Sequence, residues 1–136
     1  MEIEANKALV SQYIELWDTG NLALADEVLA PDFVDHVHPE LAPGPESVKR
    51  EVAAFRAAFP DAHITVEQMI GEGDTVAFRF TFHATHRGPF AGFPPTGKQV
   101  KITGMDFIRI ADGKIAEVWS SQDTLSFLLQ LGETIQ

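Results

Sequence analysis

Residues 1–60 carry apolar side chains at the three- to four-residue spacing of amphipathic helices. This spacing predicts helices over residues 3–18, 22–29 and 46–59. Thr19-Gly20-Asn21, Pro31 and Pro60 mark where these helices end, because glycine and proline do not continue a helix. Between the second and third helices, residues 33–37 form a short extended piece and the proline-rich residues 38–45 a loop.

Beyond residue 60, apolar and polar residues alternate as they do in β-strands. The alternation predicts antiparallel strands over residues 62–70, 75–86, 100–110 and 115–123, followed by a helix over 124–131. The Asp112-Gly113 pair predicts a tight hairpin between the last two strands, because glycine accepts the positive φ of such a turn. Helices followed by a strand meander predict an α+β fold with helices on one face of a curved sheet, as a single domain over residues 1–136.

The strand over residues 75–86 has one apolar and one polar face, and the pattern leaves open which of them faces the helices. The apolar parity includes Phe78, Phe80, Phe82 and His86, whereas Arg79 lies on the polar parity. If the polar face lined a pocket, a second copy of the sheet would have to bury the phenylalanines, which predicts a homodimer. If the apolar face is the inner one, Arg79 leaves the site and His86 stays.

Composition and charge exclude several classes of partner. With 136 residues, 45% of them hydrophobic, the chain is long enough to bury a core and a small pocket. A net charge of −10 leaves no basic patch, so we expect neither a nucleic acid nor an anionic membrane as partner. No apolar stretch reaches membrane-spanning length, and the acidic N-terminus lacks the features of a signal peptide, so we expect a cytoplasmic protein.

Asp123 is the best candidate for an acid–base group. It shares one parity of the last predicted strand with Glu117 and Trp119. An apolar wall made by Trp119 and Phe33 would disfavour the charged form of a carboxyl and suit it to transfer a proton in both directions. The alternative is structural, because an aspartate directly before an apolar helix is a common N-cap.

Five phrases of the chain resemble the SnoaL-like polyketide cyclase family. They are Leu-Ala-Pro-Asp-Phe-Val-Asp-His (29–36), Ala-Thr-His-Arg-Gly-Pro-Phe (84–90), Gly-Phe-Pro-Pro-Thr-Gly-Lys (92–98), Phe-Ile-Arg-Ile-Ala-Asp-Gly-Lys-Ile-Ala-Glu-Val-Trp (107–119) and Gln-Leu-Gly (130–132). The resemblance implies the cone-shaped fold of nuclear transport factor 2 (NTF2), with a mostly apolar pocket. It also implies ring closure by intramolecular aldol condensation without cofactor or metal, with an aspartate as acid and base, and Asp123 matches that position.

The histidines are further candidates. His36 and His86 belong to phrases shared with the family, and we expect them at the pocket mouth as donors or proton relays. His36 and His38 form a close pair that offers zinc two ligands, but no Glu-x-x-His or His-x-x-x-His pattern accompanies them. We therefore predict no metal site.

The remaining candidates for contact with the substrate are aromatic or charged. Arg79 and Asp106 stand in the centres of apolar strands, where they either hold a substrate or form an ion pair that steadies the sheet. Trp17 and Trp119 are expected as core or pocket wall, and Phe90 as cover for the pocket.

These residues predict a pocket for a small apolar or aromatic organic molecule, and a cyclase-like or isomerase-like acid–base enzyme. Two alternatives remain open, because the same fold also houses binders and hydrolases. One is a pocket protein without catalysis. The other is hydrolysis such as epoxide opening, for which Asp106 and Asp123 would supply the two acids.

Overall fold

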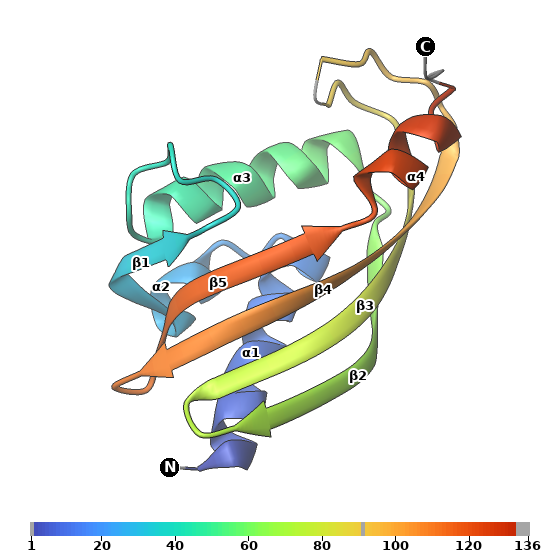
Figure 1. Ribbon diagram of the computed structural model, residues 1–136. Helices are drawn as coiled ribbons and strands as arrows, with labels where there is room; N and C mark the ends of the chain where they lie inside the picture. The colour runs from blue at the N-terminus through green and yellow to red at the C-terminus, as the bar shows by residue number, and fades with distance from the viewer. Residues whose placement is uncertain (1, 91, 133–136) are drawn as a thin grey trace.

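A computed structural model describes residues 2–90 and 92–132. Its helices and strands follow the predicted order closely (Figure 1). They are α1 (Ile3–Thr19), α2 (Ala23–Val28), β1 (Leu29–Asp35), α3 (Pro45–Ala58), β2 (His63–Glu72), β3 (Thr75–Thr85), β4 (Gln99–Ala111), β5 (Lys114–Gln122) and α4 (Thr124–Gln130). The main difference is β1, which begins at Leu29 rather than at Phe33 and so continues directly from α2.

The strands form one five-stranded sheet in the order β1-β5-β4-β3-β2. Neighbours from β2 to β5 are antiparallel, whereas β1 pairs with β5 in parallel at the edge. Figure 1 shows a strongly curved sheet with α1, α2 and α3 on one side of it and α4 near one end. The prediction of an α+β fold with N-terminal helices packed on a curved, mostly antiparallel sheet is confirmed. In the described residues, no helix is long and apolar enough to cross a membrane.

The hairpin between β4 and β5 forms where the Asp-Gly pair predicts it. Asp112 has φ 52° and Gly113 φ 74°, the two successive positive values of a type I′ turn. This turn matches the twist of the strands that it joins, and the hairpin places the centres of β4 and β5 side by side.

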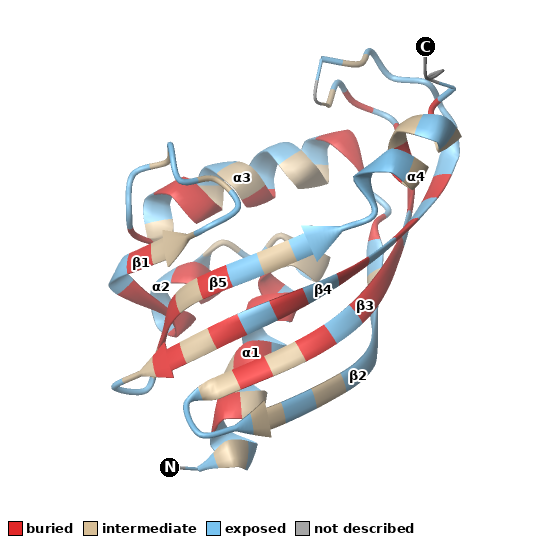
Figure 2. Ribbon diagram, in the orientation of Figure 1, coloured by how far each residue is buried: buried red, intermediate tan, exposed pale blue. Residues whose placement is uncertain are grey.

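The inner face of the sheet is its apolar face. Phe78, Phe80 and Phe82 are buried beneath the helices, and Arg79 is exposed on the opposite face. Figure 2 shows the alternation of buried and exposed residues along β3 and β4. The helices already cover the phenylalanines, so the argument for a dimer that buries them no longer applies.

A close backbone contact joins the end of α3 to the loop after β3. The amides of Arg87 and Gly88 both donate to the carbonyl of Ala58, at 2.9 and 3.1 Å. A Cβ atom on Gly88 would lie 2.5 Å from the carbonyl oxygen of Ala57 and 3.0 Å from Cα of Ala58. Only glycine allows the loop to approach the helix this closely.

We therefore expect Gly88→Ala to lower the free energy of unfolding by about 2 to 3 kcal/mol, because backbone atoms have to move to admit the methyl group. Gly73→Ala is the matched control, because Gly73 has a φ of 59° but open space around it, and its cost should stay near 1 kcal/mol. Urea denaturation measures both. Equal losses would show that the contact with α3 is not tight.

Candidate active site

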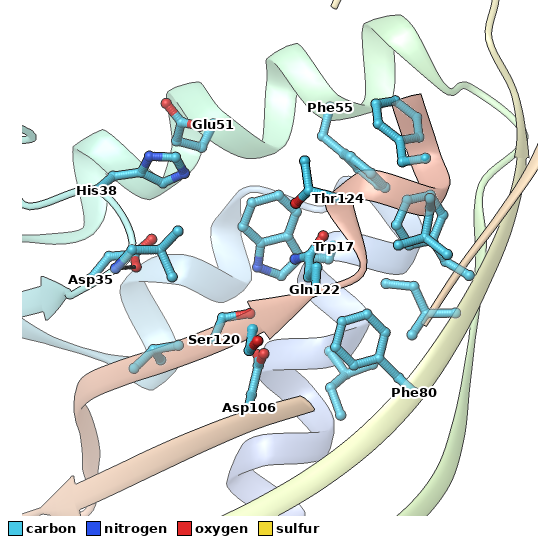
Figure 3. A pocket seen from close by; sticks show the side chains of 18 of the residues that line it. Trp17, Asp35, His38, Glu51, Phe55, Phe80, Asp106, Ser120, Gln122 and Thr124 are labelled. Carbon is cyan, nitrogen blue, oxygen red and sulfur yellow. Dashed lines mark hydrogen bonds between the residues drawn. The ribbon is translucent and has the colours of Figure 1, made fainter. Parts of the chain in front are cut away.

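A pocket of about 660 Å³ lies between the helices and the inner face of the sheet. Side chains from α1, α3, α4, the end of β1 and strands β2 to β5 line it. Figure 3 shows Phe55 and Phe80 toward one end, Asp35, His38 and Glu51 toward the other, and Asp106 and Ser120 between them. The pocket therefore has an aromatic end and a polar end.

Asp106 is the buried acid of this pocket. It lies on the inner face of β4 with Phe78 across from it on β3 and Ser120 across from it on β5, and it is 7% exposed. The pKa of Asp106 is raised to about 6, mainly because burial removes water from the carboxylate. The Ser120 hydroxyl lowers this pKa, and the charge of Asp35 raises it by less. A carboxyl with this pKa exchanges protons readily near neutral pH.

Asp106 and Ser120 keep hydrogen-bonding capacity free toward the pocket. The Ser120 hydroxyl lies near enough to favour the charged carboxylate, but the two side chains do not reach hydrogen-bond geometry. Within residues 2–90 and 92–132, neither Asp106 Oδ1 nor Ser120 Oγ has a hydrogen-bond partner, although both are buried. Buried polar atoms without partners are rare, and at a pocket wall they fit a polar group of a bound molecule.

Tyr13 adds a neutral donor beside this acid. Its phenol is buried in the pocket wall, and its pKa lies well above the usual range because burial and the charge of Asp106 both oppose ionisation. The polar group of the neighbouring Trp17 opposes this rise in pKa. Tyr13 therefore stays protonated, and its hydroxyl is suited to donate to an oxygen that gains negative charge.

The polar end of the pocket is acidic. Asp35, Glu51 and His38 line it, and the Asp35 carboxylate accepts a hydrogen bond of 2.9 Å from the amide of Val37. His38 lies 3.5 Å from Glu40 through its Nδ1 atom. Among the residues that the structure describes, no lysine or arginine lines the pocket. Across the described residues, no group of three or more histidine, aspartate and glutamate side chains has the arrangement of a metal site.

Asp123 does not lie in this pocket. It is exposed at the N-cap of α4, where its carboxylate accepts a hydrogen bond of 3.0 Å from the amide of Ser126. The prediction that Asp123 lies against an apolar pocket wall is wrong, and the structure shows the alternative, the helix cap. The physical reason is that β5 ends at Gln122, so the next residue serves the new helix.

Trp119, His36 and Arg79 lie outside the pocket as well. Trp119 is 42% exposed on the outer face of β5, and the His36 ring stacks on it with a centroid distance of 4.6 Å. His36 Nε2 lies 2.9 Å from Glu117, which also pairs with Arg109, and both contacts lower the pKa of Glu117. Arg79 donates to Gln68 at 3.0 Å on the same outer face. The predicted placement of these three residues in the pocket is therefore corrected.

His86 and Phe33 are buried, but neither lines the main pocket. His86 lies behind the pocket residue Phe59, with ring centroids 5.5 Å apart, and its Nδ1 accepts from the amide of Thr96 at 3.3 Å. Nε2 then carries the ring proton and has no partner in the described part of the chain. Phe33 lines a smaller neighbouring pocket of about 140 Å³. The predicted place of His86 at the pocket mouth is thus wrong.

Three of the predicted residues, Trp17, Asp106 and Phe90, do line the pocket. Sequence reasoning missed Tyr13, Asp35 and Ser120. Tyr13 belongs to the apolar stripe of α1, where the spacing indicates a core residue. Ser120 was missed because the inner face of the last strand was taken to be the one that carries Trp119. Ser120 lies on the opposite face of that strand, across from Asp106.

The burial of Asp106 predicts a stability that depends on pH. Its pKa rises from 3.8 to about 6 on folding, so the folded state holds the proton more tightly than the unfolded state. The contribution of Asp106 to the free energy of unfolding is fully present below pH 3.8 and falls as the pH rises to about 6. Above that pH the contribution stays low. We expect Asp106→Asn to be more stable than the parent by up to about 3 kcal/mol at pH 8 and by little at pH 4. Denaturation at both pH values measures this, and an equal effect of Asp123→Asn would contradict it.

Known proteins that resemble the chain along most of its length include methyl ester cyclases. The family model of the SnoaL-like polyketide cyclases matches residues 7–131. The aklanonic acid methyl ester cyclase of Streptomyces peucetius is 32% identical over 131 residues, with 92% of this chain and 89% of the relative covered. The nogalonic acid methyl ester cyclase of Streptomyces nogalater is 28% identical over 123 residues, with 88% and 92% covered.

Two solved structures resemble the chain along most of its length as well. IdmH, a putative polyketide cyclase from Streptomyces antibioticus, superposes with a TM-score of 0.79 at 32% identity over 94% of this chain and 99% of its own. TsrD from Streptomyces laurentii has a TM-score of 0.91 over 97% and 98% of the two chains, and at 24% identity it shows the fold alone. The arrangement of helices on a curved sheet is the NTF2-like one expected from the sequence. From the match of the family model over nearly the whole chain, this protein belongs to the SnoaL-like polyketide cyclase family.

Proposed function

We propose that this protein is an acid–base enzyme that closes a ring in, or isomerises, a small ketone or keto ester with an aromatic or apolar body. Asp106 is its general base and acid. The observation that carries the proposal is the buried Asp106 carboxyl, whose pKa is raised to about 6 and whose Oδ1 has no partner among the described residues. Asp106 takes the place assigned to Asp123 from the sequence, because Asp123 is exposed at a helix cap.

The reaction requires only side chains that line the pocket. Asp106 takes a proton from the carbon next to a carbonyl, and the electron pair of that bond forms an enolate. Tyr13 and Ser120 donate hydrogen bonds to the enolate oxygen. The enolate carbon then attacks a second carbonyl of the same molecule, and Asp106 returns its proton to the new alkoxide. Proton and charge balance without a metal or nucleotide.

The relatives support this choice of reaction and substrate class. Three of the proteins that match along most of the chain are named as methyl ester cyclases or as a putative polyketide cyclase. The aromatic end of the pocket, with Phe55, Phe80 and Phe82, suits a flat apolar body. The pocket volume of about 660 Å³ lies in the range of sites for small organic molecules.

Hydrolysis such as epoxide opening is a second candidate, supported by one observation. It needs a carboxylate that activates water and a second acid. The charge of Asp35 raises the pKa of Asp106, so the two carboxyls interact across the pocket. Asp35 therefore replaces Asp123 as the partner of Asp106 in this alternative. Binding without catalysis is the third candidate function of the pocket.

The cytoplasmic location stays a prediction from the sequence.

We also propose a homodimer. It forms through the outer face of the sheet and not through the face that carries Phe78, Phe80 and Phe82. Ile70, Met105 and Phe107 on the outer face of the sheet are 59%, 62% and 57% exposed, and Trp119 lies beside them. Ile70, Ala77, Phe107 and Trp119 follow one another across β2, β3, β4 and β5. Five strands about 4.8 Å apart, each with about ten residues, give a face on the order of 800 Å², the contribution of one partner to a standard interface.

The catalytic role is tested by following deuterium uptake next to the carbonyl of 2-acetonaphthone in D₂O, and ring closure of aromatic keto esters, with desalted, chelated protein. Asp106→Asn should keep ligand affinity and lower both rates about 10²- to 10⁴-fold, because the proton acceptor is lost. The parent rate of uptake should rise with pH through about 6, where Asp106 ionises.

Asp123→Asn is the control, since an exposed asparagine caps a helix as well as aspartate does, and it should leave the rate unchanged. A rate lost in Asp123→Asn but kept in Asp106→Asn would contradict the assignment. Ligand binding without uptake or ring closure would favour the non-catalytic pocket protein, and activity that needs added zinc would contradict the metal-free mechanism.

The homodimer is tested by sedimentation velocity. Phe107→Glu introduces a charge in the centre of the exposed apolar row and should convert a dimer to a monomer at tens of micromolar protein. Ala53→Glu adds the same side chain at an exposed position of α3, on the helical side of the sheet, and should leave the dimer intact. A monomeric parent, or equal dissociation by both variants, would contradict this interface.

A further inference from the structure

A second, smaller pocket adjoins the first. Its volume is about 140 Å³, and it lies between the end of β1, the loop over residues 39–44 and the start of α3. Trp17, Asp35 and Glu51 line both pockets. These three side chains therefore form the boundary between the two spaces, at the polar end of the main pocket shown in Figure 3.

The walls of the small pocket are mainly apolar. Phe33 and Val48 are buried there, and Pro39, Leu41 and Pro43 cover it from the loop. Ser47 is the one described residue of the wall with a hydroxyl, and this hydroxyl donates to the carbonyl of Ala42 at 2.8 Å. Apart from the two boundary carboxylates, the space offers contacts for hydrocarbon and little for a polar group.

The loop that covers this pocket is held in place by its own backbone. The Gly44 amide donates to the carbonyl of Phe33 at 2.8 Å, and the Leu41 amide to the carbonyl of His38 at 3.0 Å. Gly44 has a φ of 108°, and a Cβ atom there would lie 2.9 Å from the carbonyl oxygen of Pro31. The cover is thus built into the fold before a ligand arrives, which reduces the entropy lost on binding.

We propose that the small pocket is a subsite for a short unbranched alkyl substituent of the molecule whose aromatic body occupies the main pocket. A volume of about 140 Å³ corresponds to about five groups of the size of water or a methylene. The subsite rests on the proposed function only for the identity of the main-pocket ligand. Asp35 and Glu51 at the boundary repel an anionic tail, so the substituent is uncharged.

The probes are 2-naphthyl ketones with alkyl chains from methyl to octyl, and one hexyl chain that ends in a carboxylate. Binding is followed by the fluorescence of Trp17 in a Trp119→Phe background, where it is the single tryptophan of the chain. Each added methylene should tighten Kd about three- to fourfold until about five carbons, and further carbons should add little. The carboxylate-ended chain should bind more weakly than its uncharged counterpart.

Val48→Ala and Val52→Ala form the matched pair of variants. Val48 lines the small pocket, whereas Val52, one turn further along α3, is equally buried and lines neither pocket. Val48→Ala should move the chain length at which affinity stops rising by about two carbons, and Val52→Ala should leave it unchanged. Leu41→Ala, in the loop, replaces Val48→Ala if that variant does not fold.

An affinity that does not depend on chain length, or a break that moves equally in both variants, would overturn the subsite. The readout is affinity rather than turnover. Binding that depends on chain length without deuterium uptake would therefore contradict the proposed enzyme and support the subsite. Deuterium uptake with no dependence of affinity on chain length would support the enzyme and contradict the subsite.

Discussion

The structure depends on the packing of one face of the sheet against the helices. Phe82 on β3 lies 5.4 Å from Phe55 and 6.1 Å from Phe59 of the α3 end, measured between ring centroids. Because side chains alternate along a strand, this contact fixes which face of β3 is the inner one. The pairing of β3 with β4 then places Asp106 on the same inner face. A slip of one residue would bring Met105 inside and expose Asp106. The aromatic core and the acid of the pocket are therefore set by the same register.

The position of Asp106 is costly for folding. A carboxyl between Phe78 and Ser120 loses water and gains no hydrogen bond at Oδ1 from the described residues, which is why its pKa rises to about 6. A serine or an asparagine at this place would satisfy the fold with less loss of stability. A buried acid with one oxygen unpartnered among the described residues suits proton transfer, and sites of this kind commonly trade stability for function.

The sequence predicted the helices, the strands and the Asp112-Gly113 hairpin because these depend on local spacing. The site was predicted less well. A register shift between Arg109 and Ile110 breaks the simple alternation across β4 and β5, so that Ile115 is buried while Trp119, on the same numerical parity, is exposed. A simple alternation of inner and outer residues that starts from the buried Ile115 therefore predicts, wrongly, that Trp119 lies on the inner face. The parallel pairing of β1 with β5, which brings His36 onto Trp119, joins residues far apart in sequence and leaves no local pattern to detect.

In the proposed reaction, the charges of the pocket favour a single carboxyl as the proton carrier. Among the described residues, the lining holds Asp35, Glu51 and Asp106 but no lysine or arginine, so no permanently charged cation stabilises an enolate there. If a distant base removed the proton, the pocket would gain a further negative charge beside Asp35. When Asp106 takes the proton, its own charge disappears as the enolate charge forms, and the total stays constant. Neutral donors such as Tyr13 and Ser120 then suffice, and the acidity of the pocket becomes compatible with the reaction proposed for it.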